Sequence, residues 1–183
     1  MAPSGPASAG SPASPFDDPA FVAGLRPIPM GPLTGAGQRP AADIDGEDLD
    51  GRPLEIQVRS FDQALLLCFL HVHCDGCDSF WRGLADRPSL ELPVSVSTVA
   101  VTKGPHAVDR HEVARAAGRN LDAEGEAGPD EVPVVMSDAA WADYRVTGYP
   151  FFVLVDARTQ TVVGETVGFG WTDVYAMVQA SGL

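Results

Sequence analysis

The chain has 183 residues, of which 45% are hydrophobic, and it carries a formal net charge of −13. This hydrophobic content supports one folded domain with a core, and the acidic charge argues against a nucleic-acid or anionic-membrane partner. No apolar run approaches the roughly 18 residues that a membrane span needs. The opening MAPSGPASAGSPASP lacks the basic and apolar regions of a secretory signal. We therefore expect a cytoplasmic protein with no membrane span in this chain.

The chain changes composition near residue 40. Residues 1–40 are dense in Pro, Gly, Ala and Ser, which predicts a flexible N-terminal tail that buries little apolar surface. We expect the folded domain to occupy residues 41–183. Near its start, Asp50-Gly51 is a turn signal followed by alternating apolar residues, which predicts a small β-hairpin.

The remaining elements alternate between strands and helices. The uninterrupted apolar run ALLLCFL, residues 64–70, predicts a strand buried on both faces and therefore central in its sheet. After it we expect helices over 79–86, 106–118 and 138–146, and strands over 94–102, 132–136, 151–156 and 161–168. Ser137 or Asp138 should cap the helix over 138–146, and the last two strands should form a hairpin. A last helix, capped by Thr172, should follow. This order predicts an α/β protein with helices on both faces of the sheet.

Two cysteines in HVHCDGCDSFW, Cys74 and Cys77, follow the predicted central strand directly. In open α/β sheets, ligands bind beyond the carboxyl ends of the strands. The first N–H groups of a helix lack partners and favour negative charge, so we expect a lowered pKa and a reactive thiolate at Cys74. Cys77 follows one turn later on the same face. The pattern predicts a dithiol in which Cys74 attacks a disulfide and Cys77 resolves the mixed disulfide.

The residues beside the cysteines have opposing effects. The carboxylate of Asp75 opposes a neighbouring thiolate, whereas a protonated His73 favours it, and the sequence leaves the net sign open. Gly76 is flexible where many such loops carry proline, which costs entropy when a disulfide ring closes. Far downstream, Tyr149–Pro150 heads an apolar strand, where proline loses no ladder hydrogen bond. A cis peptide there would leave the Tyr149 backbone open to pair with a substrate strand.

Two segments, LLLCFLHVHCDGC and VTGYPFFVLVD, resemble the two halves of a thioredoxin-fold active site: the Cys-x-x-Cys turn and the cis-proline loop. EVPVVMSDAAWADYRVTGYPFFVLVD and DGEDLDGRPLEI resemble the inserted strand–helix and the N-terminal segment of the TlpA-like and redoxin branch. The resemblance covers about residues 41–183. It implies a thioredoxin fold with a central mixed β-sheet flanked by helices, an inserted strand–helix and an N-terminal hairpin. It also implies disulfide exchange with protein thiols, an electron-donor reductase as second partner, and no cofactor.

The chain departs from the thioredoxin pattern at four positions. His73 replaces the aromatic residue that usually precedes the first cysteine. Cys68 replaces the buried aspartate that helps many thioredoxins deprotonate the resolving cysteine, so the route of that proton is open, and we expect Cys68 to pack as a small apolar residue. Tyr149 is bulkier than the usual Thr or Val, which predicts a narrow choice of partners. His71 stands where peroxidases of the redoxin branch need Thr, so we expect no peroxidase activity.

Two other functions fit the same residues. Cys74 and Cys77 with His71 or His73 have the donor chemistry of a zinc site, and a metal-binding or metal-delivery module could use them. The H-x-H-C spacing is cramped, however, and the sequence has no second Cys-x-x-Cys pair. The other alternative is a thioredoxin-fold interaction domain that has kept the fold but turns over weakly.

Overall fold

A computed structural model of the protein describes residues 39–119, 121 and 131–183. The strands are β1 (Arg39–Pro40), β2 (Ile44–Glu47), β3 (Pro53–Ile56), β4 (Ala64–Phe69), β5 (Val96–Thr102), β6 (Val134–Met136), β7 (Phe151–Asp156) and β8 (Thr161–Val167). The α-helices are α2 (Asp78–Ala85), α3 (Arg110–Ala116), α4 (Asp138–Asp143) and α5 (Trp171–Ser181), and short 3-10 helices are η2 (Val58–Ser60), η3 (Asp75–Cys77) and η4 (Arg87–Ser89). The predicted tail lies outside the described residues except for its last two, which form β1.

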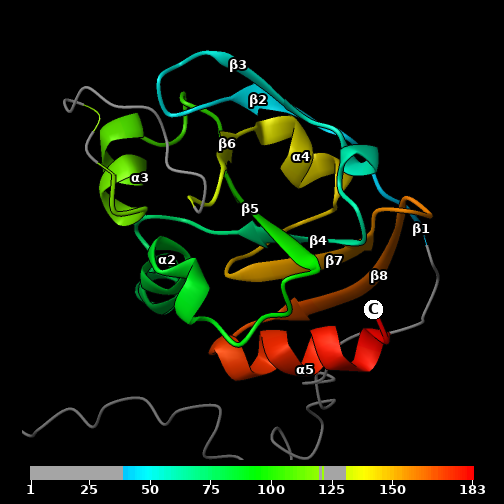
Figure 1. Ribbon diagram of the computed structural model, residues 1–183. Coiled ribbons are helices and arrows are strands. Elements are labelled where there is room, and N and C mark those ends of the chain that lie inside the picture. The colour runs from blue at the N-terminus through cyan, green and yellow to red at the C-terminus, as the bar shows by residue number, and fades with distance from the viewer. Residues whose placement is uncertain (1–38, 120, 122–130) are drawn as a thin grey trace, which may run out of the picture. The chain divides into compact units, whose positions relative to one another are not determined.

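The strands form one mixed sheet in the order β1-β8-β7-β4-β5-β6-β2-β3 (Figure 1). Strand β4 lies near its centre, parallel to β5 and antiparallel to β7. Strands β7 and β8 form the predicted antiparallel hairpin, and β2 and β3 form the predicted N-terminal one. The sequence did not indicate β1, a two-residue strand that pairs with the edge of β8.

Local sequence accounts for the hairpin and for the central strand. In the β2–β3 turn, the Asp48 carboxylate accepts hydrogen bonds from the N–H groups of Asp50 (2.9 Å) and Arg52 (2.8 Å), and Gly51 adopts the positive φ of 81° that glycine tolerates best. All six residues of β4 are buried, as expected for a strand covered on both faces.

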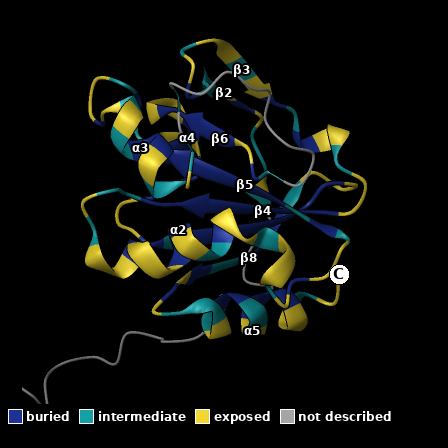
Figure 2. Ribbon diagram, turned by 60° about the vertical axis from the view of Figure 1, so that its left-hand side comes forward, coloured by how far each residue is buried: buried dark blue, intermediate teal, exposed yellow. Residues whose placement is uncertain are grey.

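Two apolar layers cover the sheet. On one face, Leu66 and Cys68 of β4 pack in a cluster with residues of α2, α3 and α5. On the other face, Leu67 and Phe69 pack in a cluster with residues of α4. Figure 2 shows the result: strands β4, β5 and β6 are almost wholly buried, and the helices expose their outer sides. Helices therefore lie on both faces, as the sequence predicted. None of the helices in the described ranges is long and apolar enough to cross a membrane.

The ends of three helices test the predicted caps. The Ser137 hydroxyl accepts a hydrogen bond from the Ala140 N–H (3.2 Å) and caps α4 as predicted. Helix α3 begins later than predicted, because the Asp109 carboxylate caps it by accepting from two backbone N–H groups of its first turn. The predicted Thr172 cap is wrong, since α5 already begins at Trp171 and its cap residue is Gly170.

The earlier start of α5 has a packing reason. The Trp171 ring contacts Phe80 at a centroid distance of 5.2 Å and Phe152 at 6.1 Å, which holds Trp171 against α2 and the sheet. The Asp173 carboxylate accepts a hydrogen bond from the Phe169 N–H (2.8 Å) just before the helix. Tertiary packing of an aromatic side chain thus decided a boundary that the capping pattern of the sequence alone misplaced.

Candidate active site

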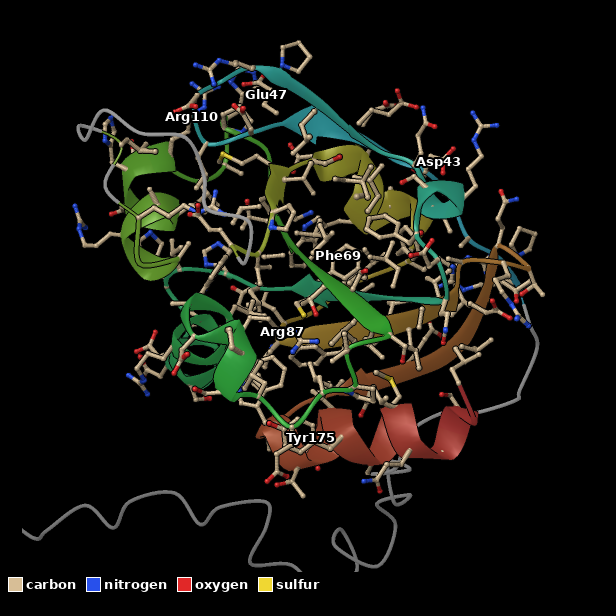
Figure 3. The ribbon with its side chains drawn as sticks, in the orientation of Figure 1. Asp43, Glu47, Phe69, Arg87, Arg110 and Tyr175 are labelled. Carbon is tan, nitrogen blue, oxygen red and sulfur yellow. The ribbon has the colours of Figure 1, made fainter. Side chains whose placement is uncertain are left out.

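The predicted site residues come together where β4 ends beside the start of β7. The two strands are antiparallel, and Phe69, the last residue of β4, pairs with Phe151, the first residue of β7. The Cys-x-x-Cys turn follows Phe69 (labelled in Figure 3), and Tyr149–Pro150 precedes Phe151. The strand pairing therefore brings two segments that are far apart in sequence to one edge of the sheet.

The two cysteines of the turn differ in exposure. Cys74 is extended, partly exposed, and directly precedes η3, which leads into α2. Cys77 is fully buried in the cluster on the α2 side of the sheet. The Cys77 N–H donates to the Cys74 carbonyl (2.8 Å), and a side-chain hydrogen bond joins the two thiols. The turn thus joins one accessible sulfur to one that is protected from solvent.

Burial keeps Cys77 in the thiol form. Burial, as the largest cause, and the hydrogen bond with Cys74 together raise the pKa of Cys77 to about 12. A hydrogen bond from the His71 backbone to the Cys77 sulfur acts in the opposite direction and lowers the pKa. At neutral pH Cys77 of the reduced pair is therefore a neutral thiol, and it is not the thiol that attacks a substrate first.

Cys68 is a third thiol in a different setting. It lies within β4 and is completely buried. Burial raises its pKa, and the guanidinium of Arg87 only partly opposes this effect. Arg87 lies on the α5 side of the sheet (Figure 3), where it donates to the Thr98 hydroxyl (3.1 Å) and the Val96 carbonyl (2.9 Å). Cys68 is thus a neutral core residue of the central strand.

Gly76 is the residue of the cysteine turn that lies close to the proline loop. A Cβ atom placed on Gly76 would lie 3.7 Å from the Cys74 sulfur and 3.7 Å from Pro150 Cδ. The small residue therefore stands between the accessible sulfur and the proline ring without filling the space. Asp75 and Gly76 are both exposed, so water screens the Asp75 charge.

The proline loop presents an aromatic side chain to solvent. The Tyr149–Pro150 peptide bond is cis, and Tyr149 is 44% exposed. Pro150 is buried, and its carbonyl accepts a hydrogen bond from the Gly168 N–H (3.4 Å). Within the described ranges, neither the N–H nor the carbonyl of Tyr149 has a hydrogen-bond partner. The backbone beside Cys74 is therefore available to another chain.

The two histidines have separate partners. His71 Nδ1 accepts a hydrogen bond from the His73 N–H (3.1 Å), and the His71 ring stacks on Tyr149 with 4.7 Å between centroids and 16° between planes. Burial, followed by the nearby His73, lowers the pKa of His71. The exposed His73 ring reaches Glu112 of α3, with 3.2 Å between Nε2 and Oε2. The structure thus gives His73 a carboxylate partner that the sequence did not reveal.

Two other side chains reach the site from strand ends. Trp141 of α4 meets Tyr149 edge-on, with 6.1 Å between centroids and 79° between planes. Lys103, which directly follows β5, places Nζ 4.6 Å from the centre of the Trp141 ring. Neither Trp141 nor Lys103 was among the predicted site residues. The available signal was that β5 and β6 are parallel to β4, so residues after them meet at the same sheet edge.

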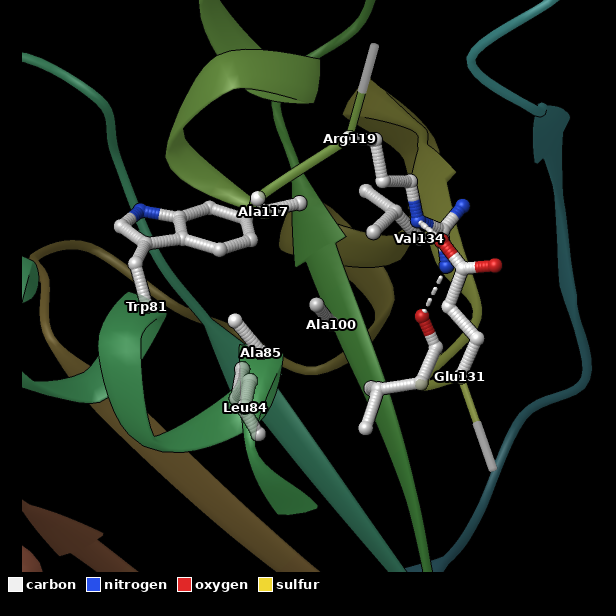
Figure 4. A pocket seen from close by; sticks show the side chains of 10 residues that line it. Trp81, Leu84, Ala85, Ala100, Ala117, Arg119, Glu131 and Val134 are labelled. Atoms are coloured by element: carbon white, nitrogen blue, oxygen red, sulfur yellow. Dashed lines mark hydrogen bonds and ion pairs between the residues drawn. The ribbon is translucent and has the colours of Figure 1, made fainter. Parts of the chain in front are cut away.

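Two structural observations concern metal binding and small-molecule binding. Across the described parts of the chain, no group of three His, Cys, Asp or Glu side chains is placed to hold a metal ion. A pocket of about 210 Å³ lies between α2, the end of α3 and β6 (Figure 4). Its lining includes Trp81 and the ion pair Arg119–Glu131, but none of the candidate site residues.

Comparisons with known proteins identify the fold. No family model matches the chain, and no curated protein matches it. Solved structures do: a thiol:disulfide interchange protein from Chlorobium tepidum has a TM-score of 0.58 and 18% identity, over 80% of this chain and 97% of that one. The thioredoxin domain of a thiol-disulfide oxidoreductase from Bacteroides vulgatus gives 0.55 and 18%, over 81% and 96%. A secreted disulfide oxidoreductase from Mycobacterium tuberculosis gives 0.51 and 18%, over 75% and 95%.

These similarities confirm the predicted thioredoxin fold, with its mixed sheet and flanking helices. The neighbours are thioredoxin-family proteins, which agrees with the resemblance seen in the sequence. At such low identities, the likeness concerns the fold, and the chemistry has to be argued from the residues of this chain.

Proposed function

We propose that this protein is a thiol–disulfide oxidoreductase that exchanges disulfides with protein partners through Cys74 and Cys77. One observation carries the proposal: an accessible cysteine is joined by hydrogen bonds to a buried one, beside a proline loop whose Tyr149 backbone groups have no hydrogen-bond partner among the described residues. Disulfide exchange through a mixed disulfide uses one thiol that a substrate can reach and a second thiol close enough to the first to resolve the mixed disulfide. The names of the structurally similar proteins point to the same chemistry.

The first step is attack by Cys74 on a substrate disulfide. The Cys74 thiolate bonds to one substrate sulfur, the substrate S–S bond breaks, and the departing sulfur takes a proton from solvent. The product is a mixed disulfide between Cys74 and the substrate. The Tyr149 backbone, exposed beside Cys74, can pair with the substrate main chain during this step, as an added strand pairs with a free edge.

The second step is resolution by Cys77. Cys77 loses its proton to solvent and attacks the Cys74 sulfur, the S–S bond between Cys74 and the substrate breaks, and the Cys74–Cys77 disulfide forms. The second substrate sulfur leaves, takes up a proton from solvent and becomes a thiol. Two electrons have then passed from the dithiol to the substrate. In the mixed disulfide Cys74 no longer carries a thiol or a charge, so the two influences by which it raises the Cys77 pKa are gone, whereas the His71 backbone hydrogen bond that lowers it can persist. Formation of the first bond thus favours the second step.

The partners follow from this cycle. The substrate is a protein disulfide, and the oxidised pair has to be reduced again by a dithiol of an electron-donor reductase. We place the protein in the cytoplasm, where thiols are kept reduced and the expected direction is substrate reduction. Cell fractionation tests the location independently, and recovery of the protein from an oxidising compartment would overturn that part of the proposal.

Insulin reduction tests the proposed activity directly. The metal-free full chain with dithiothreitol as electron donor should precipitate insulin faster than dithiothreitol alone. A chain that does not accelerate the reaction but binds zinc or copper tightly at one ion per molecule would instead support the metal-binding alternative. A chain that forms the Cys74–Cys77 disulfide but reduces no substrate would support the interaction-domain alternative.

A further inference from the structure

His71 contacts three parts of the candidate site. Its backbone is hydrogen-bonded to the Cys77 sulfur. Its imidazole Nδ1 accepts the His73 N–H (3.1 Å), and the same ring stacks on Tyr149 at 4.7 Å. One residue therefore connects the resolving thiol, the turn that leads to the nucleophile, and the proline loop.

The hydrogen bond to His73 defines the state of the imidazole. An accepting Nδ1 carries no proton, so the ring is neutral and its proton is on Nε2. The lowered pKa of His71 agrees with a neutral ring near pH 7. The His73 N–H belongs to the residue directly before Cys74, so this bond holds the backbone that leads to the attacking sulfur. The bond needs only an acceptor at this place, which the side-chain oxygen of asparagine could also supply.

The stack holds an exposed ring in place. Tyr149 is 44% exposed, yet its ring is flanked by His71 on one side and Trp141 on another. Trp141 is 3% exposed and meets Phe69 edge-on, with 5.5 Å between the centroids. The Tyr149 side chain is therefore anchored to the core although solvent reaches it. A wall that is fixed before binding costs less ordering entropy when a substrate lies against it.

We propose that His71 is a positioning residue for disulfide exchange, in which one imidazole ring holds both the Cys74 turn and the Tyr149 side chain. This inference rests on the proposed function. The two contacts of the ring should have separable effects. The hydrogen bond to the turn should govern the rate at which Cys74 attacks any disulfide, and the stack on Tyr149 should govern how tightly a protein substrate is held.

Three substitutions in the full chain separate these contacts. His71→Asn keeps an acceptor but loses the stack, His71→Phe keeps the stack but loses the acceptor, and His71→Ala loses both. The backbone bond from His71 to Cys77 is common to all three. His106→Asn serves as the matched control, because His106 is exposed. Each protein is assayed with hydroxyethyl disulfide as a small substrate and with insulin as a protein substrate.

The expected result is a crossed pattern. With the small disulfide, His71→Phe and His71→Ala should lower kcat/KM about two- to tenfold, the value of one hydrogen bond, while His71→Asn should stay near wild type. With insulin, His71→Asn and His71→Ala should raise KM about two- to tenfold, the value of one aromatic contact, while His71→Phe should keep the wild-type KM. His106→Asn should change neither.

Two results would overturn the inference while leaving the proposed function intact. In the first, the wild-type protein is active and the His71 variants have the same activity as wild type. In the second, each variant loses the same amount of activity with hydroxyethyl disulfide as with insulin. Far-UV circular dichroism and the thermal midpoint identify variants that do not fold, and in that case the folded variants of the set decide between the same outcomes. A wild-type protein that reduces neither substrate would overturn the proposed function, and this inference with it.

Discussion

The central strand β4 and the turn that follows it hold the same functional group in opposite circumstances. Cys68 in β4 is completely buried, with no exposed atom through which a partner could reach it. Six residues later, Cys74 is partly exposed, is hydrogen-bonded to Cys77, and stands across Gly76 from Pro150. The difference lies in the surroundings of the sulfur, because the thiol itself is identical.

Cys77 shares the burial of Cys68 and the reactive surroundings of Cys74. It is as buried as Cys68, yet it has two neighbours that Cys68 does not share: the Cys74 thiol and the His71 backbone. A buried thiol therefore takes part in exchange when its position gives it a reactive neighbour. The comparison predicts that substitutions in the turn will change chemistry and that a substitution in the strand will change stability.

The largest effect is expected for Cys74→Ser. Serine cannot form a disulfide, and Cys77 is inaccessible, so insulin reduction should fall to the rate of dithiothreitol alone. Stability should change little, because Cys74 is partly exposed. The insulin assay and urea denaturation measure the two quantities. Residual turnover above background in Cys74→Ser would mean that the buried thiols react with substrate directly.

Cys77→Ser should remove turnover but retain the first step. Cys74 can still attack, and without a resolving thiol the mixed disulfide accumulates. We expect one substrate molecule per chain, linked through Cys74 and released by dithiothreitol, as seen by mass spectrometry of the intact protein. Cys77→Ser that turns over substrate at the wild-type rate would contradict the role of Cys77.

Alkylation at pH 8 should separate the accessible thiol of Cys74 from the two buried thiols. With the Cys77 pKa raised to about 12, its thiolate fraction at pH 8 is on the order of 10⁻⁴. Iodoacetamide should therefore modify Cys74 first in the reduced folded protein, and all three cysteines after denaturation. Equal alkylation of Cys74 and Cys77 in the folded protein at pH 8 would refute this order.

A folded-state pKa of Cys77 raised from 9.0 also means that the stability contributed by Cys77 is complete below about pH 9 and is lost as pH rises toward 12.

A smaller effect, on stability alone, is expected for Cys68. Cys68→Ser places a hydroxyl in an apolar site and should lower the free energy of unfolding by about 1–3 kcal/mol. Cys68→Ala is the matched control, and the loss should be about 1 kcal/mol because it only removes apolar volume. Urea denaturation gives both values, and insulin reduction should stay within about twofold of wild type. A loss of activity in Cys68→Ala at unchanged stability would place Cys68 in the chemistry.

The smallest effect is expected for Glu112→Gln, which removes the ion-pair partner of His73. The His73 and Glu112 side chains are 64% and 39% exposed, and such solvent-accessible pairs contribute about 0–1 kcal/mol and weaken with salt. We therefore expect less than about a twofold change in exchange rate at 150 mM salt. A tenfold change would show that the pair controls Cys74 far more strongly than its exposure suggests.

Local patterns predicted the parts of the site that depend on neighbouring residues. The run of apolar residues from Ala64 to Leu70 indicated a central strand because only a strand covered on both faces needs no polar side. Cys74 and Cys77 directly follow this run and Pro150 heads a second apolar strand, but only the resemblance to a thioredoxin active site implied that the two segments belong to one site. The antiparallel pairing of Phe69 with Phe151 is the structural reason that they meet.

Contacts between residues far apart in the chain could not be predicted in the same way. The stack of His71 on Tyr149 and the approach of Glu112 to His73 depend on side-chain directions that only the folded sheet and helices define. The start of α5 at Trp171 depended on aromatic packing against α2 and β7, which overrode the capping preference of Thr172. The sequence thus predicted which residues belong to the site better than it predicted which of their side chains contact one another.

A redox titration of the metal-free protein tests the proposed exchange chemistry, with free thiols trapped by alkylation and each cysteine assigned by mass spectrometry. We expect one reversible two-electron step confined to Cys74 and Cys77, absent in Cys74→Ser, with Cys68 reduced throughout. The midpoint would also show whether the pair acts as a reductant or an oxidant. No Cys74–Cys77 disulfide at any potential, together with thiols protected only when metal is added, would contradict the account.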